Sequence, residues 1–404
     1  MALKPLDGIK VLDLSRVLAG PWCAQLLADL GAEVIKIERP GVGDDTRHWG
    51  PPWHHLKRGE GNDRVAAYFL SCNRGKHSAA IDFAHPEGAE LVRRLALDSD
   101  VVVENFKVGG LAKFGLDAAS LRSANPRLVY ASITGFGQDG PYADRAGYDY
   151  IIQGMGGLMS VTGLPDGEPG GGPMRVGVAV ADLFTGLYAA VAVLAALFRR
   201  ERSGDGAHID MALFDTQLAM LANQATNQLV SGKDPVRQGV GHPNLVPYQP
   251  FAAADQPIII AIGNERQFER LCAVLDHPQW TRDPRFADNG ARVANRAAIV
   301  ALIAAEIASR PAAEWLDRLE AAHIPAGPIN RISQALSDVQ AQHRAMVRQM
   351  AGMSLVGSPV RLDGERADCD LPPPALGEHT AAVLGSLGLT EAEVQALAET
   401  GVTG

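Results

Sequence analysis

MRVGVAVADLFTGLYAAVAVLAALFRR, residues 174–200, is a long apolar stretch in which Asp182 is the only charge between Val176 and Phe198. Residues 176–180 predict a short buried strand, and residues 187–198 predict a helix that is apolar on every side. Asp182 is then expected at the strand-to-helix turn, facing the positive end of the helix. Because Asp is also a frequent N-cap residue, a purely structural capping role is the alternative.

The same stretch is long enough to be compared with a membrane span, since roughly 20 apolar residues cross a bilayer. Gly177, Thr185, Gly186 and Asp182 interrupt it, and the sequence has no second run of this kind. An Asp near the middle of a span costs about 2.5 to 3.5 kcal/mol. The sequence therefore favours an element buried in a globular protein, with no membrane partner.

Composition narrows the class of protein. The 404 residues suffice for two domains with a large core, and a net charge of -9 disfavours nucleic acid and anionic membranes as partners. The four cysteines lie far apart and form no C-x-x-C motif, which indicates neither a zinc site nor a disulfide framework. The first residues show no signal-peptide pattern, so the expected location is the cytoplasm.

The first half of the chain alternates short apolar strands with amphipathic helices. Strands or extended segments are predicted at residues 9–14, 33–38, 80–83, 101–104 and 128–133, and helices at residues 23–30 and 86–98. This order predicts an α/β fold with a doubly wound parallel sheet. Ligands on such sheets bind at the carboxyl ends of the strands.

A second, smaller α/β unit is predicted after a linker. It contains a strand at residues 257–262 and helices at residues 265–275, 293–309 and 312–322. The tail is predicted to hold a short strand at residues 358–361 and a last helix that opens with a capping box, Thr390 to Glu393. The predicted organisation is a large domain from residues 1–212 and 331–404, a linker at 213–236 and a small domain at 237–330.

Common cofactor motifs are incomplete. The first turn reads LAGPWCA, residues 18–24, and lacks the G-x-G-x-x-G that lets backbone approach a pyrophosphate, which counts against an NAD-dependent oxidoreductase. NRGK, residues 73–76, lacks the first glycine of a phosphate loop. Neither G-x-S-x-G nor H-E-x-x-H occurs, and the histidines are scattered, so no metal site is predicted.

Basic residues recur at the ends of the predicted strands. Along one sheet edge they are suited to a multiply phosphorylated ligand in an otherwise acidic protein. They are Arg16, Arg39, Arg47, Arg74, Lys76, Lys107 and Lys113.

Several long motifs, in order along the chain, resemble the family III CoA-transferases, the formyl-CoA and carnitine CoA-transferase group. They are LDLSRVLAGPWCAQLLADLGAEVIKIERPGVGDDTRHWGPP, FLSCNRGKHSAAID, VVVENFKVGGLAKFGL, SITGFGQDGPYADRAGYD, the Asp182 stretch with RRERSGDGAHIDMALFD, and LPPPALGEHT. GVGDDTRHWGPPW, NLVPYQPF and GPIN look nearest to the succinate–hydroxymethylglutarate branch. The resemblance spans essentially the whole chain.

The resemblance implies that Asp182 is the catalytic carboxylate of an acyl-CoA:carboxylate CoA-transferase. Asp182 would attack an acyl-CoA thioester to give a mixed anhydride, then carry CoA as an aspartyl thioester before an acceptor acid takes it. The chemistry needs an ionised nucleophile, which a helix N-terminus favours, and exclusion of water. Coenzyme A is then substrate and product, and no tightly bound cofactor is expected.

The resemblance also implies contacts to CoA and substrate. CoA would contact Val17, Leu18, Ala19, Arg39, Asn73, Lys76, Asn105, Phe106 and Lys113. Backbone N–H groups near Gly263 and Asn264 would serve the developing oxyanion. Leu18 stands where formyl-CoA transferases have a glutamine, which argues against formyl or oxalyl substrates. Thr134 replaces a lysine of those enzymes, so one of their CoA contacts is expected to be absent.

Two further expectations concern substrate choice. α-Methylacyl-CoA racemase has a G-H-D motif where this chain has Gly147-Tyr148-Asp149, and a tyrosine with a usual pKa near 10 is a poor proton shuttle, so Tyr148 is expected to contact substrate instead. Arg47 is proposed to bind the distal carboxylate of a dicarboxylic acceptor, with an exposed loop arginine as the alternative.

Two further expectations concern the oligomeric state and whether the protein is an active enzyme. The family implies that two chains interlock as a homodimer, each with a large domain built from both chain ends. An inactive CoA-binding protein remains an alternative, in which CoA would bind without exchange.

Overall fold

The computed structural model describes residues 4–58 and 61–404, and the chain divides into two compact units. The larger unit comprises Met1–Leu158, Val176–Thr226 and Val339–Gly404, and the smaller comprises Met159–Arg175 and Asn227–Asp338. Residues 159–175, which the sequence placed in the large domain, group with the smaller unit. Arg237 accounts for this, because its Nε donates to the Leu164 carbonyl at 3.1 Å.

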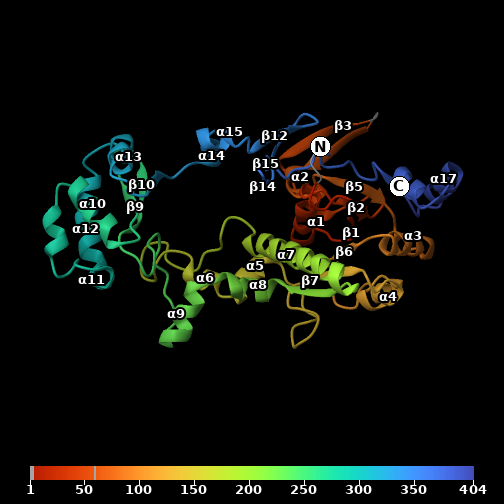
Figure 1. Ribbon diagram of the computed structural model, residues 1–404, viewed down its shortest axis with the longest axis horizontal. Coiled ribbons are helices and arrows are strands. Elements are labelled where there is room, and N and C mark those ends of the chain that lie inside the picture. The colour runs from red at the N-terminus through yellow and green to blue at the C-terminus, as the bar shows by residue number, and fades with distance from the viewer. Residues whose placement is uncertain (1–3, 59–60) are drawn as a thin grey trace. The chain divides into compact units, whose positions relative to one another are not determined.

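A six-stranded parallel sheet forms the centre of the larger unit, in the order β5-β2-β1-β6-β7-β8 (Figure 1). The chain runs from β1 outward through β2 to β5, then returns to β6 beside β1 and continues to β7 and β8. The predicted doubly wound α/β fold is therefore confirmed. The strands are β1 Lys10–Asp13, β2 Glu33–Glu38, β5 Lys76–Ala80, β6 Val101–Glu104, β7 Val129–Thr134 and β8 His208–Ala212.

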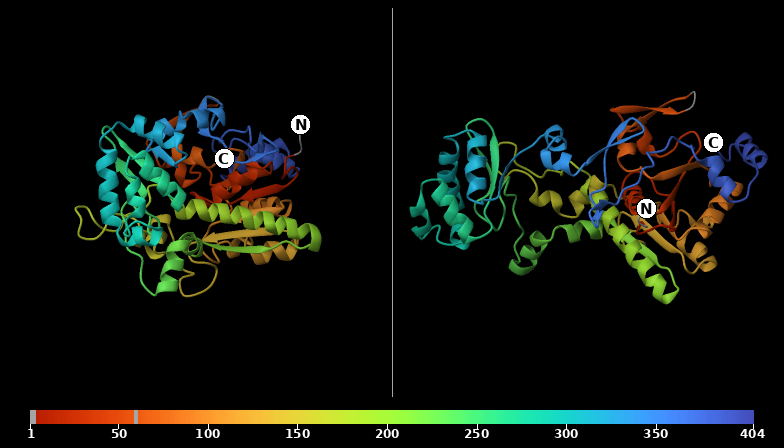
Figure 2. Two further views of the ribbon diagram at one scale, coloured as in Figure 1. Left: turned by 60° about the vertical axis from the view of Figure 1, so that its left-hand side comes forward. Right: turned by 45° about the horizontal axis from the view of Figure 1, so that its top comes forward.

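Helices cover both faces of this sheet because side chains alternate between the faces along each strand. Val11, Val101 and Val129 pack against α1 (Ala19–Asp29) and α7 (Val180–Ser203). Leu12, Val102 and Tyr130 pack on the other face, against α3 (Pro86–Leu97), α4 (Ala118–Ala124) and α16 (Thr380–Ser386). Both chain ends belong to this unit (Figure 2).

The beginning of α7 differs from the prediction. Residues 176–180 form no strand, because the Val176 N–H donates to the Gln153 side chain at 2.9 Å and Val178 is 56% exposed. The helix starts at Val180, which makes Asp182 its third residue. A Cβ on Gly186 would lie 2.5 Å from the Ala19 carbonyl oxygen, so glycine at this position allows α7 to approach α1.

By length and composition α7 could cross a membrane, with a mean hydropathy of 2.0 over its most apolar window. In the structure it packs on α1, β7, β8 and α8 (Leu213–Met220). The helix is therefore buried on one side only, with Leu187, Val191 and Phe198 exposed, where the sequence predicted a fully buried element. The absence of a membrane partner stays a prediction.

Several elements of the larger unit were not predicted. The charged loop after residue 50 contains a hairpin of β3 and β4, which projects from the unit (Figure 2). β5 starts four residues before the predicted extended segment, and β8 was missed. The capping box before α17 is confirmed. The other elements of this unit are η1 Asp45–His48, β3 Trp53–Arg58, β4 Gly61–Ala66, α2 Ala67–Ser71, η2 Ala112–Phe114, α5 Asp149–Met155, α15 Val339–His343, β12 Val347–Met350, β13 Met353–Val356, β14 Arg361–Leu362, β15 Glu365–Arg366 and α17 Glu391–Glu399.

The smaller unit contains an antiparallel three-stranded sheet in the order β11-β10-β9. Ile258, Ile260, Phe268 and Trp315 lie in its core with the inner faces of the helices. The helix predicted at residues 293–309 is two helices that meet at Asn295. The elements are β9 Tyr248–Ala252, β10 Pro257–Ala261, α10 Glu265–Val274, η3 Pro278–Arg282, α11 Asn289–Ala294, α12 Arg296–Ile307, α13 Ala312–Ala321, β11 Ala326–Pro328 and α14 Ile332–Leu336, together with α6 Leu158–Val161 and α9 Asn223–Ser231, whose first residues belong to the larger unit.

Candidate active site

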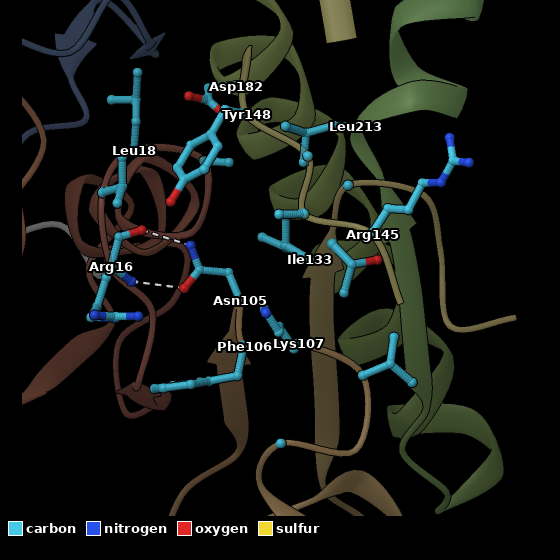
Figure 3. A pocket seen from close by; sticks show the side chains of 18 of the residues that line it. Arg16, Leu18, Asn105, Phe106, Lys107, Ile133, Arg145, Tyr148, Asp182 and Leu213 are labelled. Carbon is cyan, nitrogen blue, oxygen red and sulfur yellow. Dashed lines mark hydrogen bonds between the residues drawn. The ribbon is translucent and has the colours of Figure 1, made fainter. Parts of the chain in front are cut away.

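A cavity of about 460 Å³ lies where the strand order reverses, beyond the carboxyl ends of β1 and β6. Ligands of open α/β sheets bind at such a switch point. The turn after β1, the ends of β6 and β7, the loop before α5 and the first turn of α7 contribute its walls (Figure 3). They bring Val17, Leu18, Ala19, Asn105, Phe106, Tyr148 and Asp182 together.

Asp182 is the carboxylate of this cavity that belongs to α7. Burial raises its pKa to about 7, and the nearby Asp149 charge acts in the same direction. The sequence suggested the opposite, that the helix N-terminus would hold the carboxylate ionised. Burial and a like charge thus both favour the protonated form of the Asp182 carboxyl group.

Asp149 explains why the helix end does not stabilise Asp182. Its Oδ1 accepts the Ala181 N–H at 2.8 Å and the Asp182 N–H at 3.5 Å, and its Oδ2 accepts from Gln153 at 2.7 Å. Asp149 thus performs the capping that was the structural alternative for Asp182. The Asp182 carboxyl group does not cap the helix and lines the cavity.

The turn between β1 and α1 is held by side chains at three successive backbone N–H groups. Ser15 N–H donates to Asp13 at 2.9 Å, Arg16 N–H to Asn105 at 2.8 Å, and Val17 N–H to Asp44 at 3.3 Å. The Asn105 amide also donates back to the Arg16 carbonyl at 2.6 Å, and Figure 3 shows both Arg16–Asn105 bonds. Asn105 therefore joins the two strands that flank the switch point.

Aromatic side chains surround the carboxylate. Tyr148 lies beside Asp182 in Figure 3 and directs its hydroxyl into the cavity. The Tyr68 hydroxyl has a raised pKa, first through burial and then through the Asp182 charge, and Trp49 packs edge-on against Tyr68 at 5.3 Å between ring centroids. The sequence analysis did not select Tyr68 or Trp49, because neither follows a buried strand.

Cations line the cavity away from Asp182. Arg16 pairs with Asp45 at 3.1 Å, and Lys107 and Arg145 are exposed. A second cavity of about 410 Å³ shares Arg16, Asp45 and Phe106 with the first and includes Arg39. Both cavities therefore have cations in their walls, together with the carboxylates Asp45 and Asp182 in the first and Glu38, Asp44, Asp45 and Asp82 in the second.

Lys113 does not line this cavity. Lys113 is exposed on η2, with its Nζ 4.7 Å from the centroid of the Phe114 ring. Gly263 and Asn264 belong to the smaller unit, where Asn264 caps α10 by accepting the Gln267 N–H at 3.0 Å. Their role toward a substrate stays a prediction.

Asn73 and Lys76, two of the residues expected to contact CoA, have buried side chains. Lys76 is fully buried and its Nζ donates to Asp13, the Pro21 carbonyl and Asn73, at 2.8, 2.9 and 2.9 Å. Asn73 is also fully buried and donates to the Phe69 carbonyl at 2.9 Å. These hydrogen bonds hold both side chains in the interior, and a contact between these residues and CoA stays a prediction.

Arg47, which was expected to bind the distal carboxylate of an acceptor, has partners inside the protein. Its guanidinium binds both Glu38 oxygens, at 2.8 and 2.7 Å, donates to the Pro374 carbonyl at 3.1 Å and stacks 3.7 Å from the centre of the Phe69 ring. It is 5% exposed. A bidentate partner inside the protein already occupies the fork that was proposed for an acceptor carboxylate.

One group of side chains has the spacing of a metal site. Ligand atoms of Asp29, Asp368 and Cys369 lie within 4.8 Å of one another. The Arg74 guanidinium already binds Asp29 at 3.0 and 2.5 Å, and burial raises the pKa of the Cys369 thiol to about 12. The arrangement is that of a buried arginine–carboxylate pair with a protonated thiol.

Comparison with known sequences identifies the class of protein. The profile of CoA-transferase family III matches residues 6–380. The chain therefore belongs to CoA-transferase family III and is a transferase, as the motifs predicted.

Relatives and solved structures agree with this assignment. The chain is 50% identical to the succinate–glutarate CoA-transferase of Agrobacterium fabrum, over 96% of each chain. It is 42% identical to the succinyl-CoA:glutarate CoA-transferase of Mus musculus, over 95% of this chain and 86% of the relative. A CAIB/BAIF family protein from Brucella suis has a TM-score of 0.84 at 50% identity, covering 95% and 99% of the two chains.

Proposed function

We propose that the protein transfers CoA from an acyl-CoA, such as succinyl-CoA, to a small dicarboxylic acid such as glutarate. The names of two relatives, at 50% and 42% identity, support this pair of substrates. The observation that carries the proposal is the Asp182 carboxyl group, which lines the cavity while Asp149 caps its helix.

In the proposed reaction the ionised Asp182 attacks the thioester carbonyl and displaces CoA thiolate, which leaves a mixed anhydride. The thiolate attacks the aspartyl carbonyl of the anhydride, releases the donor acid and forms an aspartyl-CoA thioester. The acceptor carboxylate then displaces the thiolate to make a second anhydride, and the thiolate takes the acceptor acyl group and frees Asp182. Each step exchanges one acyl bond for another of similar energy, so the thioester energy is preserved.

We propose that CoA lies along the two adjoining cavities. Asn105, Phe106 and the turn at Val17–Ala19 contact the thioester arm, and Arg39 contacts a phosphate in the second cavity. Lys107 and Arg145 take over the acceptor role that was assigned to Arg47, because they carry positive charge at the wall of the first cavity.

We further propose a cytoplasmic, interlocked homodimer. All four cysteines are buried and unpaired, which suits a reducing compartment. α7 carries large apolar side chains that the single chain leaves exposed, and a second copy would cover them; they are Phe184, Leu187, Tyr188, Val191 and Phe198.

The test is a panel of acyl-CoA donors against succinate, glutarate and related acids, followed by mass spectrometry, with Asp182→Asn and Asp182→Ala beside the wild type. Both variants are expected to lose about 10³-fold or more in kcat, since the nucleophile is gone. With ¹⁸O in the acceptor carboxylate, label is expected on Asp182 after turnover. Asp288→Asn, a change at an aspartate that caps α11, is the matched control and should keep the wild-type rate.

Other outcomes would point elsewhere. CoA binding without exchange in the wild type would indicate an inactive CoA-binding protein. Exchange of an α-proton with deuterated water would indicate a racemase. An Asp182→Asn variant at the full rate would refute the covalent pathway.

A further inference from the structure

Val17 has an unusual backbone conformation at the wall of the cavity. Its φ is +72°, in the left-handed region, where a β-branched residue is a genuine outlier. Conformations of this kind persist only when the surrounding structure holds them, and they concentrate at functional sites. The position of Val17 therefore needs a specific restraint.

Asp44 supplies a restraint on Val17. The Val17 N–H donates to both oxygens of the Asp44 carboxylate, each at 3.3 Å. Asp44 is itself fixed from the other side, because its Oδ1 accepts from the Thr46 N–H at 3.0 Å and from the Thr46 hydroxyl at 2.8 Å.

Lys36 joins Asp44 to the same turn. Its Nζ lies 3.0 Å from Asp44 Oδ2 and donates to the Ser15 carbonyl at 2.7 Å. The side chains of Lys36 and Asp44 have no exposed surface. The buried pair thus binds the turn at two backbone positions, Ser15 and Val17. Leu18 and Ala19, which line the cavity, follow directly, and α1 begins at Ala19.

We propose that Asp44 is a positioning residue for the cavity: it holds Val17 in the left-handed conformation and thereby fixes the wall formed by Leu18 and Ala19. The inference rests on the proposed function, since that wall is where CoA is expected to bind. Asp44 acts through Val17 and does not itself touch the reacting groups.

A double-mutant cycle with Asp44→Asn and Val17→Gly tests the inference, because glycine adopts a positive φ without a Cβ penalty. Calorimetry gives the CoA dissociation constant, and kinetics give KM and kcat. Asp44→Asn is expected to weaken CoA binding and raise KM about tenfold when residue 17 is valine, and about threefold or less when it is glycine. Where Asp44→Asn alone does not fold, Asp44→Asn with Lys36→Met enters the same cycle, since that pair leaves no unpaired buried charge.

Thr46→Val is the matched control. It removes a hydrogen bond from the same carboxylate without touching Val17, so it is expected to lower the melting temperature while the CoA dissociation constant stays within about twofold. Equal losses from Asp44→Asn with valine and with glycine at position 17 would overturn the proposal, as would a Thr46→Val variant that binds CoA as weakly as Asp44→Asn. A wild type that neither binds nor transfers CoA would refute the proposed function instead.

Discussion

Asp44 and Asp182 are carboxylates of the same unit with opposite surroundings: the side chain of Asp44 is buried, and that of Asp182 is partly exposed at the cavity. Burial would raise the pKa of Asp44, but the Lys36 charge and hydrogen bonds from Thr46 hold it below its usual value. Burial raises the pKa of Asp182 to about 7, and its charged neighbour, Asp149, has the same sign. The difference shows that burial alone does not set the charge of a carboxyl group: Asp44, beside a cation, has a lowered pKa, and Asp182, beside another carboxylate, has a raised pKa.

The largest effect is expected when a cation is removed from the buried network beneath the cavity. Lys76→Met leaves Asp13, which is fully buried, without its partner at 2.8 Å and should lower the free energy of unfolding by about 3 to 5 kcal/mol. Urea denaturation measures the change. If Lys76→Met had wild-type stability and only a raised KM for acyl-CoA, the result would indicate that Lys76 contacts CoA.

Lys113→Met is the control for that measurement. Lys113 is exposed on η2, so the free energy of unfolding should change by no more than about 0.5 kcal/mol.

Removing the charge at Asp182 should increase the free energy of unfolding, whereas Lys76→Met should decrease it. Its folded-state pKa lies above the unfolded value, so the folded chain binds more protons between pH 4 and 7 and loses stability as the pH rises through that window. Asp182→Asn should therefore raise the free energy of unfolding at pH 8 by about 1 to 3 kcal/mol, less than the shift implies because the group is partly exposed.

The gain from Asp182→Asn should nearly vanish at pH 4, where the folded forms of both chains are uncharged at this position. Denaturation at pH 8 and pH 4 separates the two conditions. A destabilised Asp182→Asn variant at pH 8 would mean that an unseen favourable contact holds the carboxylate.

The smallest effect is expected at Asp149. In Asp149→Asn the amide oxygen still accepts the Ala181 N–H, but the like charge is gone, so the pKa of Asp182 should fall. The acid limb of the kcat/KM profile should move to lower pH, and the ratio of the rate at pH 6 to that at pH 8 should rise about 2- to 3-fold. An unmoved profile would show that burial alone sets the pKa of Asp182.

The sequence predicted much of the sheet because short segments rich in Val and Ile recur between helical segments. Residues 33–38 and 101–104 match β2 and β6, and the helix predicted at residues 86–98 matches α3 within one residue. Residues 176–180 misled the prediction: their β-branched pattern is typical of a strand, but Val178 is exposed and the Val176 N–H bonds to a side chain. Local pattern carries no information on such a distant partner.

The cavity was predicted in part for a similar reason. Leu18 and Asn105, which the resemblance implied as CoA contacts, line the cavity because the carboxyl ends of parallel strands meet at one edge of the sheet. Arg47 and Lys76 were also near strand ends, yet both turn inward to carboxylates at Glu38 and Asp13. A basic residue has the same letter whether it faces solvent or an acidic partner, so sequence alone could not separate these cases.

The position of Asp149 against the first turn of α7 has a consequence for the energy of the reaction. In every covalent form of the proposed cycle Asp182 is an ester-like, uncharged group, so the mutual repulsion with Asp149 and the cost of keeping a bare anion out of water both disappear. In the proposed cycle the free enzyme therefore has the higher electrostatic energy at Asp182, and formation of the covalent bond to the substrate lowers that energy.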